Sequence, residues 1–200
     1  RAPFASRTLR GGRGGRRDAQ ACGLTFRKGG GGEIAEAGWD AFFAFYRASV
    51  DRKWGSAYLT RSFFSLLSRN LGDRVVLMLA EQEGKPVAAA LNLLGDETLY
   101  GRNWGCEGDW PFLHFELCYY RAIEFAIAHG LARVEAGAQG EHKIQRGYMP
   151  SLTYSAHHIR HPGLREAVAA FLDAERPAIL QEVDSLAAQS PYRTETGQEG

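Results

Sequence analysis

Residues 74–104 read RVVLMLAEQEGKPVAAALNLLGDETLYGRNW, and three β-strands are predicted within them. Apolar runs cover 74–81, 86–94 and 98–104, and the turn sequences EGK and GDE between them suit tight hairpins. The middle run is almost wholly apolar, so both of its faces should be covered by other elements. The stretch therefore predicts three antiparallel strands at the centre of the fold.

Two amphipathic helices and a short strand are predicted before this sheet. The strand covers 24–28, and the first helix covers 34–50 with its aromatic side chains on one face. The hydroxyl of Thr60 can cap the second helix, in which Phe63, Phe64 and Leu67 face the core.

Further elements are predicted after the sheet. A helix covers 111–129 and ends at Gly130 in the C′ position, and a strand at 131–138 leads into a polar loop. Another strand is expected at 151–159. The last helix covers 164–188 and should be kinked or divided by the proline inside it.

The order of these elements is β-α-α-β-β-β-α-β-loop-β-α. It predicts an α+β fold in which a mixed, mostly antiparallel sheet is flanked by helices. The order resembles the core arrangement of the GNAT acyltransferase superfamily. Order alone indicates a fold, and function has to be argued from a site.

The composition is that of an ordinary globular protein. Of the 200 residues, 44% are hydrophobic and 24% are charged, and the net charge of +1 selects neither acidic nor basic partners. No apolar run approaches the roughly 20 residues that cross a bilayer. The cysteines, Cys22, Cys106 and Cys118, are scattered and form no CxxC, which favours reduced thiols and a cytoplasmic location.

Three regions are expected from the sequence. Residues 1–21 form a basic segment rich in Arg and Gly, 22–188 form the acyltransferase-like domain, and 189–200 form a polar tail. The basic segment is interpreted as a disordered arm, and the alternative is an arm that contacts the phosphates of RNA. The chain begins with Arg rather than Met, so we expect a fragment or a processed product.

Reactive side chains are concentrated in residues 100–148, at the ends and connections of a predicted strand, helix and strand. A stable fold does not require so many ionisable groups in one span, whereas a functional site does. The polar side chains in question are His114, Glu116, Glu135, Gln139, Glu141, His142, Lys143 and Arg146.

An anion site is one hypothesis for the start of this span. Arg102, Trp104 and Gly105 lead towards a helix N-terminus, where backbone N–H groups and a nearby Arg can hold phosphate or carboxylate. GNAT enzymes hold the coenzyme A pyrophosphate with a [QR]-x-x-G-x-[GA] loop. Here the last position is Glu107, which repels a pyrophosphate, and the predicted helix begins several residues too late.

The start of the helix offers a candidate general base. Glu116 and Tyr120 share a helical face, and Glu116 can act towards an amine while His114 binds substrate. The alternative is structural: Glu116 favours the positive helix end and His114 caps it. The H-x-E pair lacks the P-C-x-x-C of zinc deaminases, and His114 and Glu116 with Glu141 and His142 lack the spacing of metal ligands, so no metal is expected.

The segment 135–146 is the strongest candidate for chemistry. Small residues there leave the backbone open to a ligand, and Glu135 is expected to point inward. Glu141 or His142 can deprotonate an attacking amine, and Lys143 or Arg146 can hold a carboxylate or phosphate. The alternative is a solvated polar loop. Catalysis is assigned to Glu141 and His142, and substrate binding to Glu135, Gln139, Lys143 and Arg146.

A third cluster lies between the first two helices. The loop at 51–55 holds two cations beside an indole, and we assign substrate binding to Arg52, Lys53 and Trp54.

Five motifs resemble a bacterial family of predicted N-acyltransferases within the GNAT superfamily, which carries the label peptidoglycan biosynthesis or recognition. The resemblance covers about 22–187. The motifs are RKWG at 52–55, YL at 58–59, LYGRNWG at 99–105, LHFELCYY at 113–120 and EAGAQGEHKIQRGY at 135–148.

The resemblance implies transfer of an acyl group to an amine. The family is similar to Fem-type aminoacyltransferases, which attach amino acids from aminoacyl-tRNA to cell-wall precursors. The donor is then acyl-CoA or aminoacyl-tRNA, and the acceptor is a small-molecule or cell-wall-precursor amine. The alternatives are a non-catalytic binding module for a cell-wall precursor or tRNA, and a C-terminal half that requires an N-terminal half for activity.

Overall fold

The computed structural model describes residues 22–52, 55–137 and 141–192. The described residues fall into two compact units, one within residues 10–138 and one within residues 139–200. The predictions for residues 1–21, for Lys53 and Trp54, and for Gln139 lie outside the described residues.

The first unit is built on a five-stranded sheet in the order β1-β2-β3-β4-β5. Neighbouring strands are antiparallel except β4 and β5, which are parallel. The strands are β1 (Thr25–Gly30), β2 (Val75–Gln82), β3 (Lys85–Leu94), β4 (Thr98–Cys106) and β5 (Arg133–Glu135). The predicted mixed, mostly antiparallel sheet is therefore confirmed.

The hairpins follow the predicted turn sequences. Glu83 and Gly84 connect β2 to β3 with φ angles of 50° and 78°. Two successive positive φ angles match the right-handed twist of the strands, and Gly84 adopts its angle without steric penalty. After β3, the N–H of Gly95 donates to the carbonyl of Thr98 at 2.8 Å.

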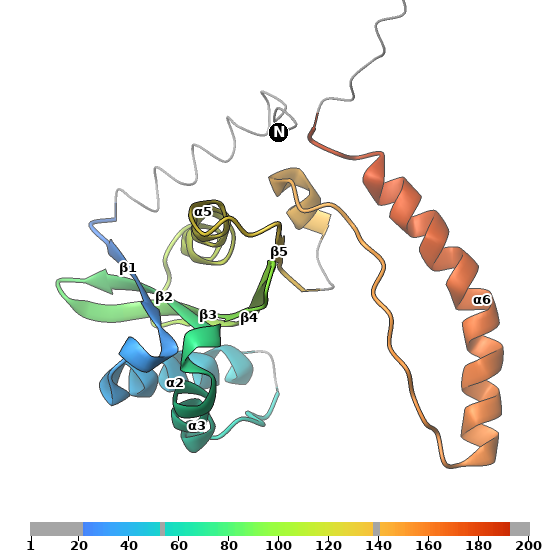
Figure 1. Cartoon of the computed structure of the whole chain (residues 1–200), viewed down its shortest axis with the longest axis horizontal. Helices are drawn as coiled ribbons and strands as arrows, with labels where there is room; N and C mark the ends of the chain where they lie inside the picture. Colours follow the sequence, from blue (N-terminus) through green and yellow to red (C-terminus); the bar gives the residue numbers. More distant parts are fainter. Residues whose placement is uncertain (1–21, 53–54, 138–140, 193–200) are drawn as a thin grey trace, which may run out of the picture. The chain divides into compact units, whose positions relative to one another are not determined.

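Helices cover both faces of the sheet (Figure 1). One face carries α2 (Glu36–Asp51) and α3 (Arg61–Leu71), preceded by the short η1 (Gly31–Glu33) and followed by η2 (Gly72–Arg74). The other face carries α4 (Leu113–Phe115), a π-helical turn η3 (Glu116–Tyr120) and α5 (Arg121–Ala128).

Two hydrophobic clusters result, one on each face. Trp39, Phe42 and Phe64 are fully buried on the α2–α3 side, where they pack on Leu77 and Leu91. The cluster on the α5 side contains Met78, Ala90, Leu113, Leu117 and Phe125. The covered central strands and the aromatic face of the first helix were thus predicted correctly. The prediction that Phe63 faces the core is wrong, because its side chain is 38% exposed.

The helix ends differ from the sequence prediction in one place. The N–H of Phe63 donates to Thr60 Oγ1 at 3.3 Å, so the predicted cap is present, and Gly130 adopts the expected positive φ of 67°. However, the predicted helix over 111–129 starts only at Leu113 and is interrupted by η3. Phe112, with a φ of 61°, turns the chain before the helix and accounts for its late start.

The second unit contains η4 (Glu141–Arg146) and α6 (Pro162–Ala187). The predicted strand at 151–159 is wrong: the segment forms no ladder with another described residue, and nearly all of it is exposed. A strand needs a hydrogen-bonding neighbour, and local β-propensity does not supply one. Pro177 lies inside α6 without dividing it.

Candidate functional site

The carboxyl-terminal half of β4 has an open edge. Only Thr98, Leu99 and Tyr100 pair with β5, whereas β4 continues to Cys106. On this edge, the peptide groups after Tyr100 have no ladder partner among the described residues. The ladder ends at Tyr100, although the chain is still close at Gly101, where a Cβ atom would lie 3.2 Å from the carbonyl oxygen of Glu135. An extended ligand can pair with such an edge.

A β-bulge interrupts β4 at Arg102. Leu91 pairs with Asn103 and Asn92 pairs with Gly101, so Arg102 has no partner on β3. Bulges turn a side chain out of the regular alternation and are frequent beside active sites.

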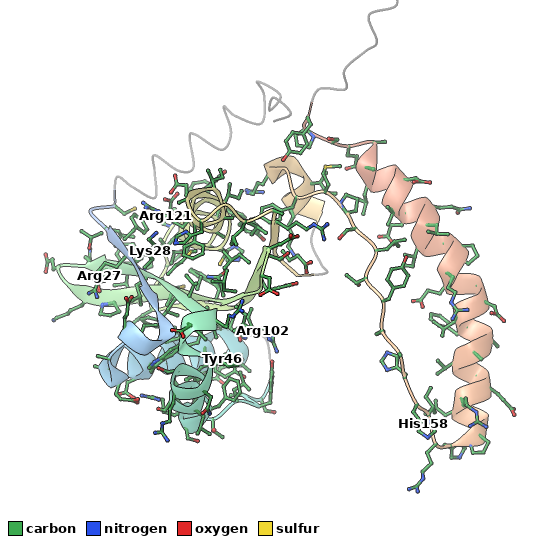
Figure 2. The ribbon with its side chains drawn as sticks, viewed as in Figure 1. Arg27, Lys28, Tyr46, Arg102, Arg121 and His158 are labelled. Carbon is green, nitrogen blue, oxygen red and sulfur yellow. The ribbon has the colours of Figure 1, made fainter. Side chains whose placement is uncertain are left out.

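The bulge directs Arg102 towards the loop between α2 and α3. Its Nη2 donates to the hydroxyl of Tyr58 at 2.7 Å, and the Tyr58 ring lies edge-on to Tyr46 with 6.4 Å between centroids. The hydroxyl of Tyr46 accepts the N–H of Leu59 at 3.3 Å. Figure 2 shows Arg102 and Tyr46 on this side of the sheet. The Arg102–Tyr58 hydrogen bond therefore ties the loop to β4, and the two contacts with Tyr46 tie the loop to α2.

An aromatic cluster lies next to β4 on the α5 side. The ring centroids of Trp104 and His114 are 5.1 Å apart, and those of His114 and Tyr119 are 5.5 Å apart. Both contacts are edge-to-face, the arrangement that ring quadrupoles prefer. The cluster brings together Trp104 and His114, which the sequence analysis assigned to substrate binding. The N-cap position of α4 is Phe112 and not His114, and the choice between a capping and a binding role for His114 stays a prediction.

Glu116 is fully buried and ion-paired. Its Oε1 accepts a hydrogen bond from Nε of Arg121 at 2.8 Å. The pair is five residues apart, a spacing that an α-helix does not bring together but that the π-turn does. A carboxylate enclosed in this way is poorly placed to reach an amine, so the structure favours a structural role for Glu116 over general-base catalysis.

The proposed phosphate-loop residues lie within a strand. Arg102 and Gly105 belong to β4, and six residues separate Cys106 from the helix start at Leu113. A Cβ atom on Gly105 would overlap the carbonyl of Phe45, so this glycine allows α2 to approach the sheet. The geometry supports a packing role for Gly105.

The remaining predicted residues of the first unit are more dispersed. Arg52, after α2, hydrogen-bonds Ser49 Oγ at 3.2 Å and lies near Cys106. Burial raises the pKa of Cys106, and the charge of Arg52 opposes this shift. Tyr120 is half-buried, and Glu135 is exposed. The expectation that Glu135 points inward is wrong, because β5 ends at Glu135 and leaves its side chain at the rim of the sheet.

The second unit carries the residues to which we assigned catalysis. Glu141, His142, Lys143 and Arg146 belong to η4, and the side chains of Glu141 and His142 lie outside the described part. Burial lowers the pKa of Lys143. Their assignment to one site with Trp104 and His114 stays a prediction.

Two residues that contact the candidate site residues, Tyr58 and Arg121, were not assigned from the sequence. Tyr58 belongs to the YL motif, but nothing in its local pattern indicates that it contacts Arg102. Arg121 was missed because we expected an α-helix, which places residue 120 rather than 121 beside Glu116.

The described residues contain no group of three or more His, Cys, Asp or Glu side chains arranged to hold a metal ion. None of the helices formed by these residues combines the length and the apolar character required to cross a membrane.

Residues 2–194 match the FemAB-like family, described as peptidoglycan biosynthesis/recognition. The chain belongs to this family. The match confirms the resemblance inferred from the motifs, and it also includes the Arg/Gly-rich segment and part of the tail. No curated protein matches the sequence.

Solved structures show that this FemAB-like protein has the fold of GNAT acetyltransferases. A predicted acetyltransferase with acetyl-CoA from Clostridium acetobutylicum has a TM-score of 0.52 and 11% identity, over 69% of this chain and 99% of that one. A Trypanosoma brucei acetyltransferase has a TM-score of 0.50 and 9% identity, over 68% and 99%. An aminoglycoside acetyltransferase from an uncultured soil sample, with trehalose, has a TM-score of 0.48 and 14% identity, over 70% and 96%.

Proposed function

We propose that this FemAB-like protein is an N-acyltransferase, which moves an acyl or aminoacyl group from an activated donor to an amine. The observation that carries the proposal is the open edge of β4 beyond Tyr100, with the bulge at Arg102 beside it. The family and the fold support it, since two solved structures that share the fold are those of an acetyltransferase and of a predicted acetyltransferase.

The open edge suits an extended donor that carries amides. Peptide groups of β4 can exchange hydrogen bonds with such a donor as they would with a strand. An N–H group aimed at the acyl carbonyl would also stabilise the oxyanion that forms when the amine attacks. The acyl carbon would then lie beside Trp104 and His114.

The choice between the two donors depends on which phosphate groups the site can hold. The Clostridium acetobutylicum acetyltransferase was solved with acetyl-CoA, which supports an acyl-CoA donor. The connection from β4 to α4 opposes it, because Glu107 replaces a small residue and Phe112 delays the helix. We therefore keep aminoacyl-tRNA as the alternative donor, in keeping with the family.

Proton transfer is assigned to the second unit. The attacking amine has to lose a proton, and Glu141 or His142 is proposed as the base, with Lys143 and Arg146 binding an anionic part of the substrate. Arg102 and Tyr58 are proposed to orient the acceptor at the edge of β4. Substrate positioning of this kind supplies much of the rate of acyl transfer.

A donor screen followed by a transfer assay tests the proposal. Acetyl-CoA, a longer acyl-CoA and an aminoacyl-tRNA mimic are each added to the protein, and the melting temperature is recorded. A donor at about 100 times its dissociation constant stabilises the fold by about 2.7 kcal/mol. Mass spectrometry then detects acylation of a small amine and of a cell-wall precursor.

Variants separate the assigned roles. Arg102→Met should lower kcat/KM for the donor that binds, whereas Arg69→Met on the exposed face of α3 should not. Replacing Glu141 by Gln and His142 by Asn together should abolish turnover without loss of donor binding. Unchanged turnover would exclude these two residues as the base. Binding of a precursor without transfer from any donor would instead indicate a non-catalytic recognition module.

A further inference from the structure

A cavity of about 320 Å³ opens between β1 and the helical layer of α5. Its deepest residues are Met78 and Leu117, which are almost fully buried. It lies at the β1 edge of the sheet, whereas the open edge of β4 lies towards the other side. The lining residues are Phe26, Arg27, Lys28, Met78, Leu117, Arg121, Glu124, Phe125 and Ala128.

Two crossed cation–π contacts frame this cavity. The Nζ of Lys28, on β1, lies 5.2 Å from the ring centroid of Phe125, on α5. In the second contact, Cζ of Arg121, on α5, lies 4.5 Å from the ring centroid of Phe26, on β1. Figure 2 shows Lys28 and Arg121 on these neighbouring elements. Each element thus places a cation over an aromatic ring of the other.

The two cations, Arg121 and Lys28, differ in whether carboxylates lie close enough to form ion pairs with them. Nε of Arg121 is 2.8 Å from Glu116 Oε1, and its Nη1 is 3.9 Å from Glu124 Oε2. Among the ion pairs of the described residues, none involves Lys28. Arg27, the third cation of the lining, is paired with Glu81 Oε1 at 3.0 Å. The positive charge at the cavity that has no carboxylate partner among the described residues is therefore that of Lys28.

We propose that this cavity binds a small amphipathic anion, a carboxylate or phosphate monoester whose apolar group packs on Met78 and Leu117. The acid would meet Lys28 and the remaining donor of Arg121. A volume near 320 Å³ lies at the small end of ligand cavities and suits on the order of ten non-hydrogen atoms. This site goes beyond the proposed acyl transfer and does not depend on it.

The charge and polarity of the cavity select this class of ligand. A cationic ligand is disfavoured, because the faces of Phe26 and Phe125 already carry Arg121 and Lys28. A fully polar anion gains nothing from the apolar floor, and a neutral apolar molecule leaves the charge of Lys28 unused. Only a molecule with both parts makes both contacts.

Calorimetric titration of the full chain with four probes tests the proposal. Octanoate and octyl phosphate carry both parts, inorganic phosphate carries only the acid, and octanol carries only the tail. Octanoate or octyl phosphate should bind about tenfold or more tightly than either partial probe, because a charge-assisted hydrogen bond adds to apolar burial. The stronger of the two identifies the acid.

Substitutions at the rim separate charge from shape. Lys28→Met keeps an unbranched apolar stem and should weaken the better probe about tenfold, whereas Lys28→Arg should keep its affinity. Lys85→Met removes a lysine outside the cavity and serves as the matched control. Glu124→Gln removes a negative charge from the lining and should tighten binding.

Two results would overturn the site. Octanol that binds as tightly as both acids would show that no anion is recognised. Equal affinities in the wild type and in folded Lys28→Met, checked by circular dichroism, would show that Lys28 does not contact the ligand. Since no acyl transfer is measured, the failure of this site and the failure of the proposed function remain distinguishable.

Discussion

Gly105 of β4 lies against the backbone of Phe45 in α2, so closely that a Cβ atom on Gly105 would overlap the Phe45 carbonyl oxygen. Neither partner can move as a flexible side chain would, because both are backbone within regular elements. The contact fixes the distance between α2 and the strand that carries the open edge.

Gly105→Ala should therefore destabilise the fold. Overpacking of a tight core contact costs about 1–3 kcal/mol, and the rigid partner places this site at the upper end. Urea unfolding followed by tryptophan fluorescence measures the change. Gly32→Ala is the control, since a Cβ atom on Gly32 meets nothing within 4 Å. Equal unfolding midpoints for the two variants would contradict the close contact.

Removal of Arg121 should leave a buried charge without its counterion. Glu116 is fully buried, whereas the Arg121 side chain is 31% exposed, so Arg121→Met should cost roughly 2–4 kcal/mol, somewhat below the loss for a fully enclosed pair. Adding Glu116→Gln should restore part of the loss, and the double-mutant cycle gives the coupling. Arg176→Met breaks an exposed pair with Asp173 and should change stability little.

The ion pairs between α2 and α3 should make stability depend on acid pH. Nη2 of Arg61 lies 2.5 Å from Glu36 Oε2, and Nε of Arg61 lies 2.6 Å from Asp40 Oδ1. Hydrogen bonds from Arg61 and Ser65 lower the pKa of Glu36. A lowered folded pKa stabilises the fold above the ordinary carboxyl pKa, and this contribution is lost as the pH falls through the folded value.

Glu36→Gln should accordingly be less stable than the wild type at pH 7, and the difference should shrink below about pH 4. Thermal unfolding across this pH range measures it. Glu97→Gln serves as a control, because Glu97 is exposed and its side chain forms no ion pair within the described part of the chain. If the stability difference between the wild type and Glu36→Gln instead grew as the pH fell, the pKa of Glu36 would not be lowered in the folded state.

Two of the three thiols should resist alkylation. Burial raises the pKa of Cys118 strongly and that of Cys106 less, so little thiolate is present at pH 8. Iodoacetamide should modify both at least about 100-fold more slowly in the folded protein than in urea. Peptide mass spectrometry at timed intervals identifies the modified cysteines. Rapid labelling of folded Cys118, which is only partly buried, would contradict the raised pKa of its thiol.

The sequence predicted elements that depend on local signals. The cap at Thr60, the hairpin turn at Glu83 and Gly84, and the apolar central strand each follow from residues adjacent in the chain. Features that depend on pairing between distant segments were missed. The bulge at Arg102 is a property of the register between β3 and β4.

The site was predicted only in part, because some of its contacts also join segments that are distant in the sequence. Trp104 and His114 were both assigned, and the structure brings them together. Tyr58 was missed because its partner is 44 residues away in the chain. The segment 151–159 resembled a strand because its composition favours β-structure, but it lacks a pairing partner among the described residues.

The brevity of β5 has a consequence for the dynamics of the sheet. Three paired residues join β5 to β4, whereas β2 and β3 pair along nearly their whole length. The free energy of local opening at β5 should therefore be a small fraction of that for global unfolding, and its amides should exchange with deuterium well before those of β2 and β3. The sheet can thus widen beside Gly101 while its central strands stay folded.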